Sequence, residues 1–372
     1  MLYAKIAFQL YFILPSTIII SYVFQRHFMD MKKQDQNLSV SSPIFFAMFN
    51  NSVYAEIIQQ SLKKAVFPGQ PHKLYEPIRY ILSLSGKRIR PQLVLMGAAL
   101  FDEQAVEKSI SASLAIEYFH NFSLIHDDIM DKAPLRRGKP TVHQKWSDNV
   151  AILSGDALLV KAYEELAKSP SDKMVPLLQL FNKTSLEVCE GQQIDMDFET
   201  RDIVSEAEYI DMIRLKTSVL LGGALQMGAI IAGADKHDQE LLYDFGVNLG
   251  IAFQLQDDIL DVYGDPRTFG KQVGGDILAN KKTILYVKLN ELIAPEDKET
   301  LALLLNGDIA VEPQKIEKMR MLYAKYDIPT LAIYQKEKFT EIAYERLRAI
   351  RVADEKKQSL FTLANALLHR SK

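Results

Sequence analysis

The spacing of apolar residues constrains the fold of this chain more than any other feature. From about Val53 onward, apolar residues recur three and four positions apart, as in Leu241, Phe245 and Leu249. This spacing places them on one face of a helix, and no alternating strand patterns joined by hairpin turns are found. We therefore expect an all-α chain. Glycine and proline mark the predicted connections between long helices, at Pro68-Gly69, 136–140, 264–275 and Pro295.

The predicted helices belong to one large bundle. No linker is long enough to separate two domains, so we expect residues 51–372 to form one domain. The last segment, from Phe339 to His369, is expected to be a single amphipathic helix. Residues 1–50 differ in composition and form a separate N-terminal extension.

The N-terminal extension contains an apolar stretch, residues 6–24, that is just long enough to span a bilayer. Basic residues follow this stretch more than they precede it, which would leave the rest of the chain in the cytoplasm. Three interpretations stay open: a membrane anchor, a cleaved secretory signal without a good cleavage site, or an extension upstream of the true start. The candidate start residues are Met29, Met31 and Met48.

Charge and cysteine content exclude several classes of function. The net charge of -3 gives no strong basic field, so we do not expect a nucleic-acid partner. Cys189 is the single cysteine, which excludes an internal disulfide and fits a reducing compartment such as the cytoplasm. No Cys/His cluster has zinc spacing, so any metal must be held by oxygen ligands.

The chain contains two DDxxD motifs, at 127–131 and 257–261. On a helix, the first and last aspartates of each motif lie one turn apart on the same face, where they repel each other. Mg²⁺ prefers carboxylate oxygens and completes its shell with water and phosphate. One such motif alone could be a solvated helix face. Because both motifs lie in strongly apolar helices, the pair favours two metal sites that clamp a diphosphate.

Basic segments accompany the acidic motifs. Residues 86–91 read GKRIRP, and residues 136–139 read RRGK. The planar guanidinium of arginine binds phosphate oxygens with two parallel hydrogen bonds, so these segments suit a diphosphate. Lys216-Thr217 and Lys271, which lies in a glycine-rich loop, are further candidates. Each segment alone could also be ordinary surface charge.

Several long motifs in order resemble the trans-isoprenyl diphosphate synthases, the polyprenyl synthetase family, over roughly residues 53–372. The matching segments are GKRIRP at 86–91, HNFSLIHDDIMD at 120–131, LRRGKPTVH at 135–143, GQQIDMD at 191–197, LKTSVLL at 215–221, FQLQDDILD at 253–261 and FGKQVGGDILANKKT at 269–283. The resemblance implies the all-helical isoprenoid synthase type I fold. It also implies a Mg²⁺-dependent transferase, with three ions per active site, and a homodimer. Its substrates would be isopentenyl diphosphate and an allylic diphosphate such as dimethylallyl, geranyl or farnesyl diphosphate.

The resemblance also implies roles for individual residues. The metal ligands would be Asp127, Asp131, Asp257 and Asp261, with Asp128 and Asp258 completing the motifs. The allylic diphosphate would contact Arg136, Lys216 and Lys271, and isopentenyl diphosphate would contact Lys87, Arg90, His120 and Arg137. The residues nearest the forming allylic cation would be Thr217 and Gln254, while Gln192 and Lys281 would reach the diphosphate region.

Residues just upstream of the first acidic motif are expected to limit product length. Phe122 and Ser123 occupy the fifth and fourth positions before Asp127, one large and one small. This combination resembles geranylgeranyl-type enzymes, so we expect a C20 product, with C15 as the alternative. Phe122 could equally be a core residue.

Three other functions stay open at this point. A class I terpene cyclase uses a DDxxD helix but normally lacks a second copy and the GKRIRP segment. A non-catalytic prenyl synthase subunit would usually have lost one acidic motif. A membrane-tethered structural protein is suggested only by residues 6–24.

Overall fold

The computed structural model describes residues 52–264, 273–306 and 312–368, and within them the chain is almost wholly helical, as predicted. The first half contains α4 (Val53–Lys64), α5 (His72–Ser83), α6 (Ile89–Phe101), α7 (Ala105–Lys108), α8 (Ile110–Met130), α9 (Val142–Lys145), α10 (Asp148–Leu166) and α11 (Met174–Glu199). A short 3₁₀ turn, η1 (Ser171–Lys173), precedes α11. The two-residue strands β1 (Leu135–Arg136) and β2 (Lys139–Pro140) pair in an antiparallel ribbon between α8 and α9. The predicted connection at 136–140 is therefore a tight hairpin.

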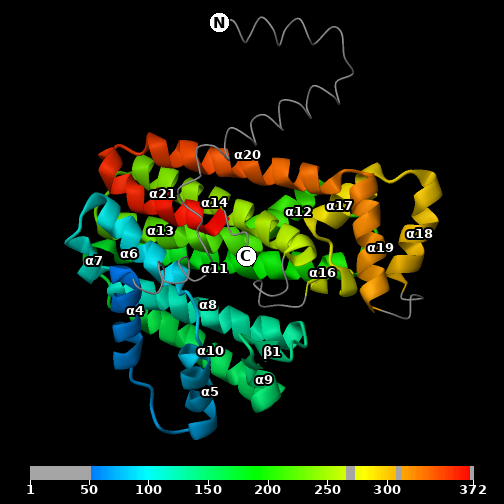
Figure 1. The fold of residues 1–372 in the computed structure, drawn as a ribbon. Helices are drawn as coiled ribbons and strands as arrows, with labels where there is room; N and C mark the ends of the chain where they lie inside the picture. Colours follow the sequence, from blue (N-terminus) through cyan, green and yellow to red (C-terminus); the bar gives the residue numbers. More distant parts are fainter. Residues whose placement is uncertain (1–51, 265–272, 307–311, 369–372) are drawn as a thin grey trace, which may run out of the picture. The chain divides into compact units, whose positions relative to one another are not determined.

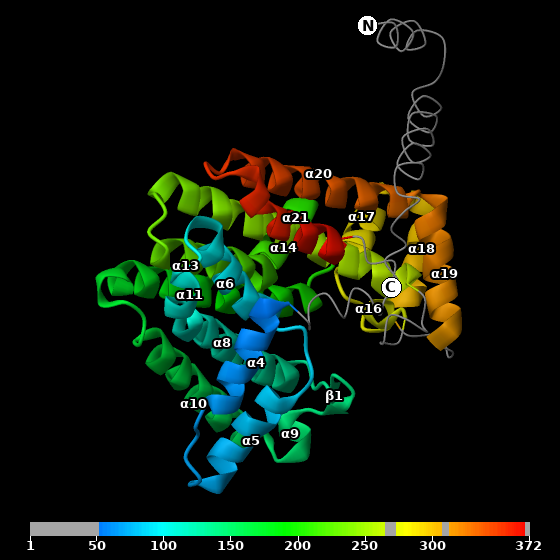
Figure 2. The ribbon, with the colours of Figure 1, turned by 60° about the vertical axis from the view of Figure 1, so that its left-hand side comes forward.

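The second half continues the bundle. Its elements are α12 (Glu206–Ile213), the π-helical turn η2 (Arg214–Ser218), α13 (Val219–Ile231), α14 (Lys236–Tyr263), α16 (Gly275–Leu278), α17 (Ile284–Leu292), α18 (Pro295–Leu305), α19 (Glu312–Lys325), α20 (Ile328–Ala349) and α21 (Asp354–Leu368). Figure 1 shows α20 and α21 along one side of α14, with α11, α8 and α10 following on the other side. Figure 2 shows α18 and α19 beside α17 at one end of the bundle.

α13 at the centre of the bundle is apolar all round, because it is covered on every side. α14 packs against α13, η2 and α20, and nearly every residue of α13 is buried. Glycines allow the backbones to approach closely. A Cβ added to Gly228 of α13 would lie 2.1 Å from the carbonyl oxygen of Val94 in α6. The core therefore holds the helices that carry the acidic motifs in fixed relative positions.

The prediction of one C-terminal helix from Phe339 onward is wrong, because the chain turns between α20 and α21. Arg351 lies at this turn, and its backbone N–H donates to Asp238 Oδ1 at 3.2 Å. Its side chain also bonds Asp235, at the N-terminal end of α14. These long-range contacts stabilise the turn between α20 and α21, and the local spacing of apolar residues does not predict them. Pro295, predicted to lie in a connection, is instead the first residue of α18, a position that proline favours.

No helix within the described ranges is both long and apolar enough to cross a membrane. The apolar stretch 6–24 lies outside these ranges, as do Lys271 and His369.

Candidate active site

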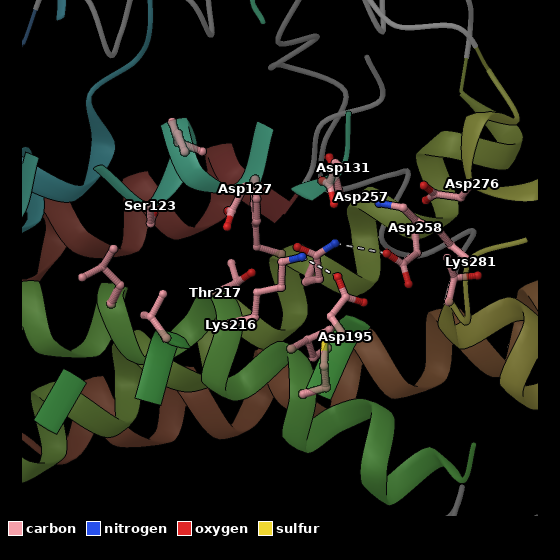
Figure 3. A pocket seen from close by; sticks show the side chains of 18 of the residues that line it. Ser123, Asp127, Asp131, Asp195, Lys216, Thr217, Asp257, Asp258, Asp276 and Lys281 are labelled. Carbon is pink, nitrogen blue, oxygen red and sulfur yellow. Dashed lines mark hydrogen bonds and ion pairs between the residues drawn. The ribbon is translucent and has the colours of Figure 1, made fainter. Parts of the chain in front are cut away.

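Both acidic motifs face one cavity of about 430 Å³ between α8, α11, η2 and α14. Figure 3 shows Asp127 and Asp131 of the first motif close to Asp257 and Asp258 of the second. Among the described residues, the acidic side chains that line it are Asp127, Asp131, Asp195, Asp257, Asp258, Asp261 and Asp276. The basic side chains that line it are Arg90, Arg136, Lys216, Lys281 and Lys282. The carboxylates outnumber these cations, which makes the cavity a good site for added positive charge.

The first acidic motif lies at the C-terminal end of α8. Asp127 lines the cavity, and Asp131 caps the helix. Asp128 is buried and accepts two hydrogen bonds from Arg136, Nε to Oδ2 at 2.8 Å and Nη2 to Oδ1 at 2.7 Å. The hairpin after α8 carries Arg136 back to this position. Arg136 also lines the cavity, and its predicted contact with a diphosphate stays a prediction.

The second acidic motif lies near the C-terminal end of α14. Asp257 and Asp261 line the cavity. Asp261 Oδ2 accepts a hydrogen bond from the backbone N–H of Asp276 at 3.0 Å, which connects α14 to α16. The middle residue, Asp258, is 3% exposed and is bound by groups from three different segments. The middle aspartate of each motif is therefore committed to protein contacts.

The electrostatics of the cavity suit a divalent cation. The pKa of Asp127 is raised to about 6, mainly by burial and further by the neighbouring carboxylates of Asp131 and Asp128, although Lys216 and Arg136 oppose the shift. A bound cation would favour the charged carboxylate. Within the described ranges, no group of three or more His, Cys, Asp or Glu side chains alone could hold a metal ion. The carboxylate oxygens that line the cavity are of the type that Mg²⁺ prefers, and Mg²⁺ usually completes its shell with water and phosphate oxygens.

Lys216 is presented by an unusual turn of helix. It lies in η2, and π-helical turns are rare and frequently occur at functional sites. α11 approaches this turn so closely that a Cβ on Gly191 would lie 2.2 Å from the Lys216 backbone nitrogen. The ammonium of Lys216 forms an ion pair with Asp195, also of α11. Thr217 lines the cavity beside it (Figure 3). Gln192, the neighbour of Gly191, is buried and does not line the cavity.

The residues predicted to bind isopentenyl diphosphate come together in part. Arg90 Nη1 lies 3.3 Å from His120 Nε2, and both residues line the cavity. The pKa of His120 lies well below its usual value because the ring is buried among arginines, so the ring is neutral. The guanidinium of Arg137 donates to the carbonyl oxygen of Leu84 at 3.3 Å, which brings the hairpin to the GKRIRP segment. Lys87 instead lines a separate cavity of about 800 Å³.

The two residues predicted to limit product length have different surroundings. Ser123 lines the cavity one helical turn before Asp127 (Figure 3). Phe122 is not among the lining residues, and its ring contacts those of Phe119 and His126, with centroids 5.7 and 4.7 Å away. Of the pair, Ser123 directly adjoins the space where a product tail could extend.

The sequence reasoning missed several residues of this site. Asp195 and Asp276 line the cavity, yet neither belongs to a DDxxD motif. Lys281, in contrast, was predicted from the sequence and lines the cavity. Burial alone lowers its pKa, but nearby carboxylates led by Asp276 raise the pKa overall. Tyr209 was missed entirely, because a lone tyrosine in an amphipathic helix carries no signal of a polar site. The acidic letters of the IDMD and GGDIL segments were the available clue for Asp195 and Asp276.

The fold, the paired acidic helices and the cationic lining define a class of helical diphosphate-binding enzymes. The family model for polyprenyl synthetase matches residues 71–324. The chain therefore belongs to the polyprenyl synthetase family.

Named relatives agree with this membership. A geranylgeranyl diphosphate synthase from Sulfolobus acidocaldarius is 38% identical over 291 residues, which cover 77% of this chain and 87% of that protein. A geranylfarnesyl diphosphate synthase from Natronomonas pharaonis is 38% identical over 247 residues, covering 62% of this chain and 72% of that protein. A crystal structure of a geranylgeranyl pyrophosphate synthetase from Pyrococcus horikoshii has a TM-score of 0.79 at 35% identity, covering 88% of this chain and 98% of that chain.

Proposed function

We propose that this chain is a Mg²⁺-dependent trans-prenyltransferase that joins isopentenyl diphosphate to an allylic diphosphate and releases a short-chain isoprenoid diphosphate. The observation that carries the proposal is the arrangement of two acidic motifs and several cations around a single cavity. The family membership and the names of the relatives support the same reaction. We infer that residues 51–372 carry it.

We assign one group of residues to binding Mg²⁺ and another to binding the allylic diphosphate. Asp127 and Asp131 on α8, with Asp257 and Asp261 on α14, would hold Mg²⁺, three ions in all. The bound Mg²⁺ supplies positive charge that neutralises the departing diphosphate. Arg136, Lys216 and Lys271 contact the same diphosphate and lower the barrier to breaking the carbon–oxygen bond.

The second substrate must be held where the allylic cation forms. Arg90 and His120 line the cavity, and we assign them to the diphosphate of isopentenyl diphosphate. Arg137, whose hairpin adjoins the GKRIRP segment, and Lys87, which lines the separate cavity, are the other two residues assigned to it. The double bond of this substrate attacks the cation, and a new carbon–carbon bond forms. A proton then leaves for the released diphosphate, which restores a double bond. Gln254 and Thr217 face the reacting carbons, and the cavity must exclude water that would quench the cation.

For product length we propose C20, with C15 as the alternative. The support is that a small residue, Ser123, adjoins the cavity directly, while the bulk of Phe122 lies against Phe119 and His126. A small side chain at this position leaves room for a growing tail. Relatives named for geranylgeranyl and for geranylfarnesyl diphosphate both exist, so the length has to be measured.

We also infer a homodimer that forms through α10 and α11. Large apolar side chains on these two helices are exposed to solvent: Ile152, Leu153, Val160, Val175, Leu178 and Leu186. The two helices are neighbours, because Tyr163 of α10 donates to Asn182 of α11 at 2.8 Å and its ring packs on Phe181. Exposed large apolar side chains on two neighbouring helices are typical of a protein–protein interface.

The decisive experiment incubates the purified protein with labelled isopentenyl diphosphate, each allylic diphosphate in turn, and Mg²⁺, and then measures product length. We expect elongation that stops with a chelator and in the variant Asp127→Ala. The matched control is Asp172→Ala, which removes an aspartate that is 72% exposed and distant from the cavity. Release of diphosphate with a cyclised hydrocarbon would indicate a terpene cyclase instead. A folded protein without activity on any primer would indicate a non-catalytic subunit.

A further inference from the structure

The carboxylate of Asp258 is bound on both oxygens by groups from three segments of the chain. Its Oδ2 accepts from the hydroxyl of Tyr209 on α12 and from the backbone N–H of Ile284, at 3.1 Å, where α17 begins. Its Oδ1 accepts from Gln254 Nε2, one turn earlier on α14, at 3.2 Å (Figure 3). The N-terminus of a helix favours a negative charge, so α17 helps to hold the carboxylate in place.

These contacts decide how the side-chain amide of Gln254 is oriented. In the structure the NH₂ end of the amide faces Asp258, because Gln254 Nε2 donates to Asp258 Oδ1. The carbonyl oxygen, Oε1, is then left at the other end of the amide. Gln254 lines the cavity together with Thr217 and Lys216. An amide oxygen carries partial negative charge, which stabilises positive charge that develops nearby in the cavity.

Tyr209 completes this arrangement from a separate helix. Its side chain is 2% exposed, and it lines the cavity. Burial is the main reason that its pKa lies well above the usual value, and the nearby carboxylate of Asp258 adds to this. The hydroxyl therefore stays protonated and remains a donor. Without it, Oδ2 would keep only the Ile284 N–H, and the carboxylate could turn and release Gln254.

We propose that Tyr209 is a positioning residue for the reaction and that, through Asp258, it holds the amide oxygen of Gln254 toward the developing allylic cation. This inference rests on the proposed function. It predicts that Tyr209 affects the chemical step rather than the binding of either substrate, because neither its hydroxyl nor Asp258 needs to touch a substrate.

The first test is Tyr209→Phe, which keeps the ring and removes the hydroxyl. We expect kcat to fall by about ten-fold while KM for both substrates stays unchanged, as for the loss of one hydrogen bond to a charged group. The control is Tyr326→Phe, which removes a hydroxyl that also donates to a carboxylate, Asp297, outside the cavity. Thermal unfolding of both variants checks the fold. An unchanged kcat in Tyr209→Phe overturns the inference.

A double-mutant cycle with Gln254→Leu tests whether Tyr209 acts through Gln254. If it does, adding Tyr209→Phe to Gln254→Leu costs little further activity; if the two losses multiply, the inference is wrong. An independent test exchanges donor and acceptor. Gln254→Glu should lower kcat by placing two carboxylates together, and adding Asp258→Asn should restore part of it. Absence of elongation in the wild-type protein would instead refute the proposed function.

Discussion

At the scale of single residues, the two acidic motifs each divide into ligands and supports. Asp128 is bound by Arg136, and Asp258 is bound by Tyr209, Gln254 and Ile284. Both middle aspartates are nearly fully buried and face protein donors. The outer aspartates line the cavity in each motif. The middle aspartates are therefore the most strongly bound by protein donors, although Asp258 also lines the cavity and Asp261 accepts one hydrogen bond from the Asp276 backbone.

Ser123 gives the first prediction at this scale. Ser123→Phe places a large ring where a small side chain adjoins the cavity, so we expect the longest product to shorten by at least one isoprene unit. Product analysis by mass spectrometry measures this. Phe122→Ala is the companion variant, and the sequence-based hypothesis predicts a longer product from it. If neither variant changes the product, residues upstream of Asp127 do not set the length.

His120 gives a prediction on pH. Its pKa is well below 6.5 in the folded protein because of burial and the surrounding arginines, whereas an unfolded histidine titrates near 6.5. Below pH 6.5 the unfolded state therefore binds a proton that the folded state does not bind. The free energy of unfolding consequently decreases as the pH is lowered. In His120→Gln the free energy of unfolding should fall less steeply between pH 6.5 and 5, by up to about 1.4 kcal/mol per pH unit.

At the scale of elements, the contact between α11 and the π-helical turn η2 sets the place of Lys216. The absence of a side chain at Gly191 allows this contact. Gly191→Ala would force the two backbones apart, and overpacking of this kind costs about 1–3 kcal/mol. We expect denaturant unfolding to show this loss of unfolding free energy, together with a clear fall in kcat. Gly69→Ala, where an added Cβ meets nothing within 4 Å, is the control and should change neither the free energy of unfolding nor kcat.

The elements also show what local sequence could predict. The spacing of apolar residues predicted the helices, and each DDxxD motif predicted an acidic helix face. Both patterns are local, because each lies within one or two turns of helix. The break after α20 could not be predicted, since it depends on Arg351 reaching Asp235 and Asp238 across more than one hundred residues. The ion pair of Lys216 with Asp195 and the bond of Tyr209 to Asp258 likewise join distant segments. Resemblance to a family supplied the roles of Lys216 and Gln254, which spacing alone would not have identified.

At the scale of the whole molecule, the exposed apolar face of α10 and α11 gives a prediction about assembly. We expect light scattering after size-exclusion chromatography to report a dimer. Leu153→Glu should give monomers, because it places a charge on a side chain that is 60% exposed in the middle of this face. Leu303→Glu, on α18, also alters an exposed leucine and should leave the dimer intact. A wild-type monomer at micromolar concentration would contradict the inferred interface.

The N-terminal extension gives a second prediction at this scale. The family model begins at residue 71, and every residue assigned a role lies after residue 86. We therefore expect a protein that lacks residues 1–28 to retain full kcat and the same product length. Loss of activity from the shortened protein, with its helical content intact by circular dichroism, would show that the extension takes part in catalysis.

Ser123 and Asp127 lie one turn apart on the same rigid helix, which ties product size to helix geometry. A turn of helix advances about 5.4 Å, close to the length that one isoprene unit adds to an extended tail. If Ser123→Phe shortens the product as predicted, a bulky side chain moved by one turn along α8 should change the product by about one building block. Single substitutions on the face of α8 that carries Ser123 should therefore change the number of isoprene units in the product and leave Asp127 and Asp131 in place.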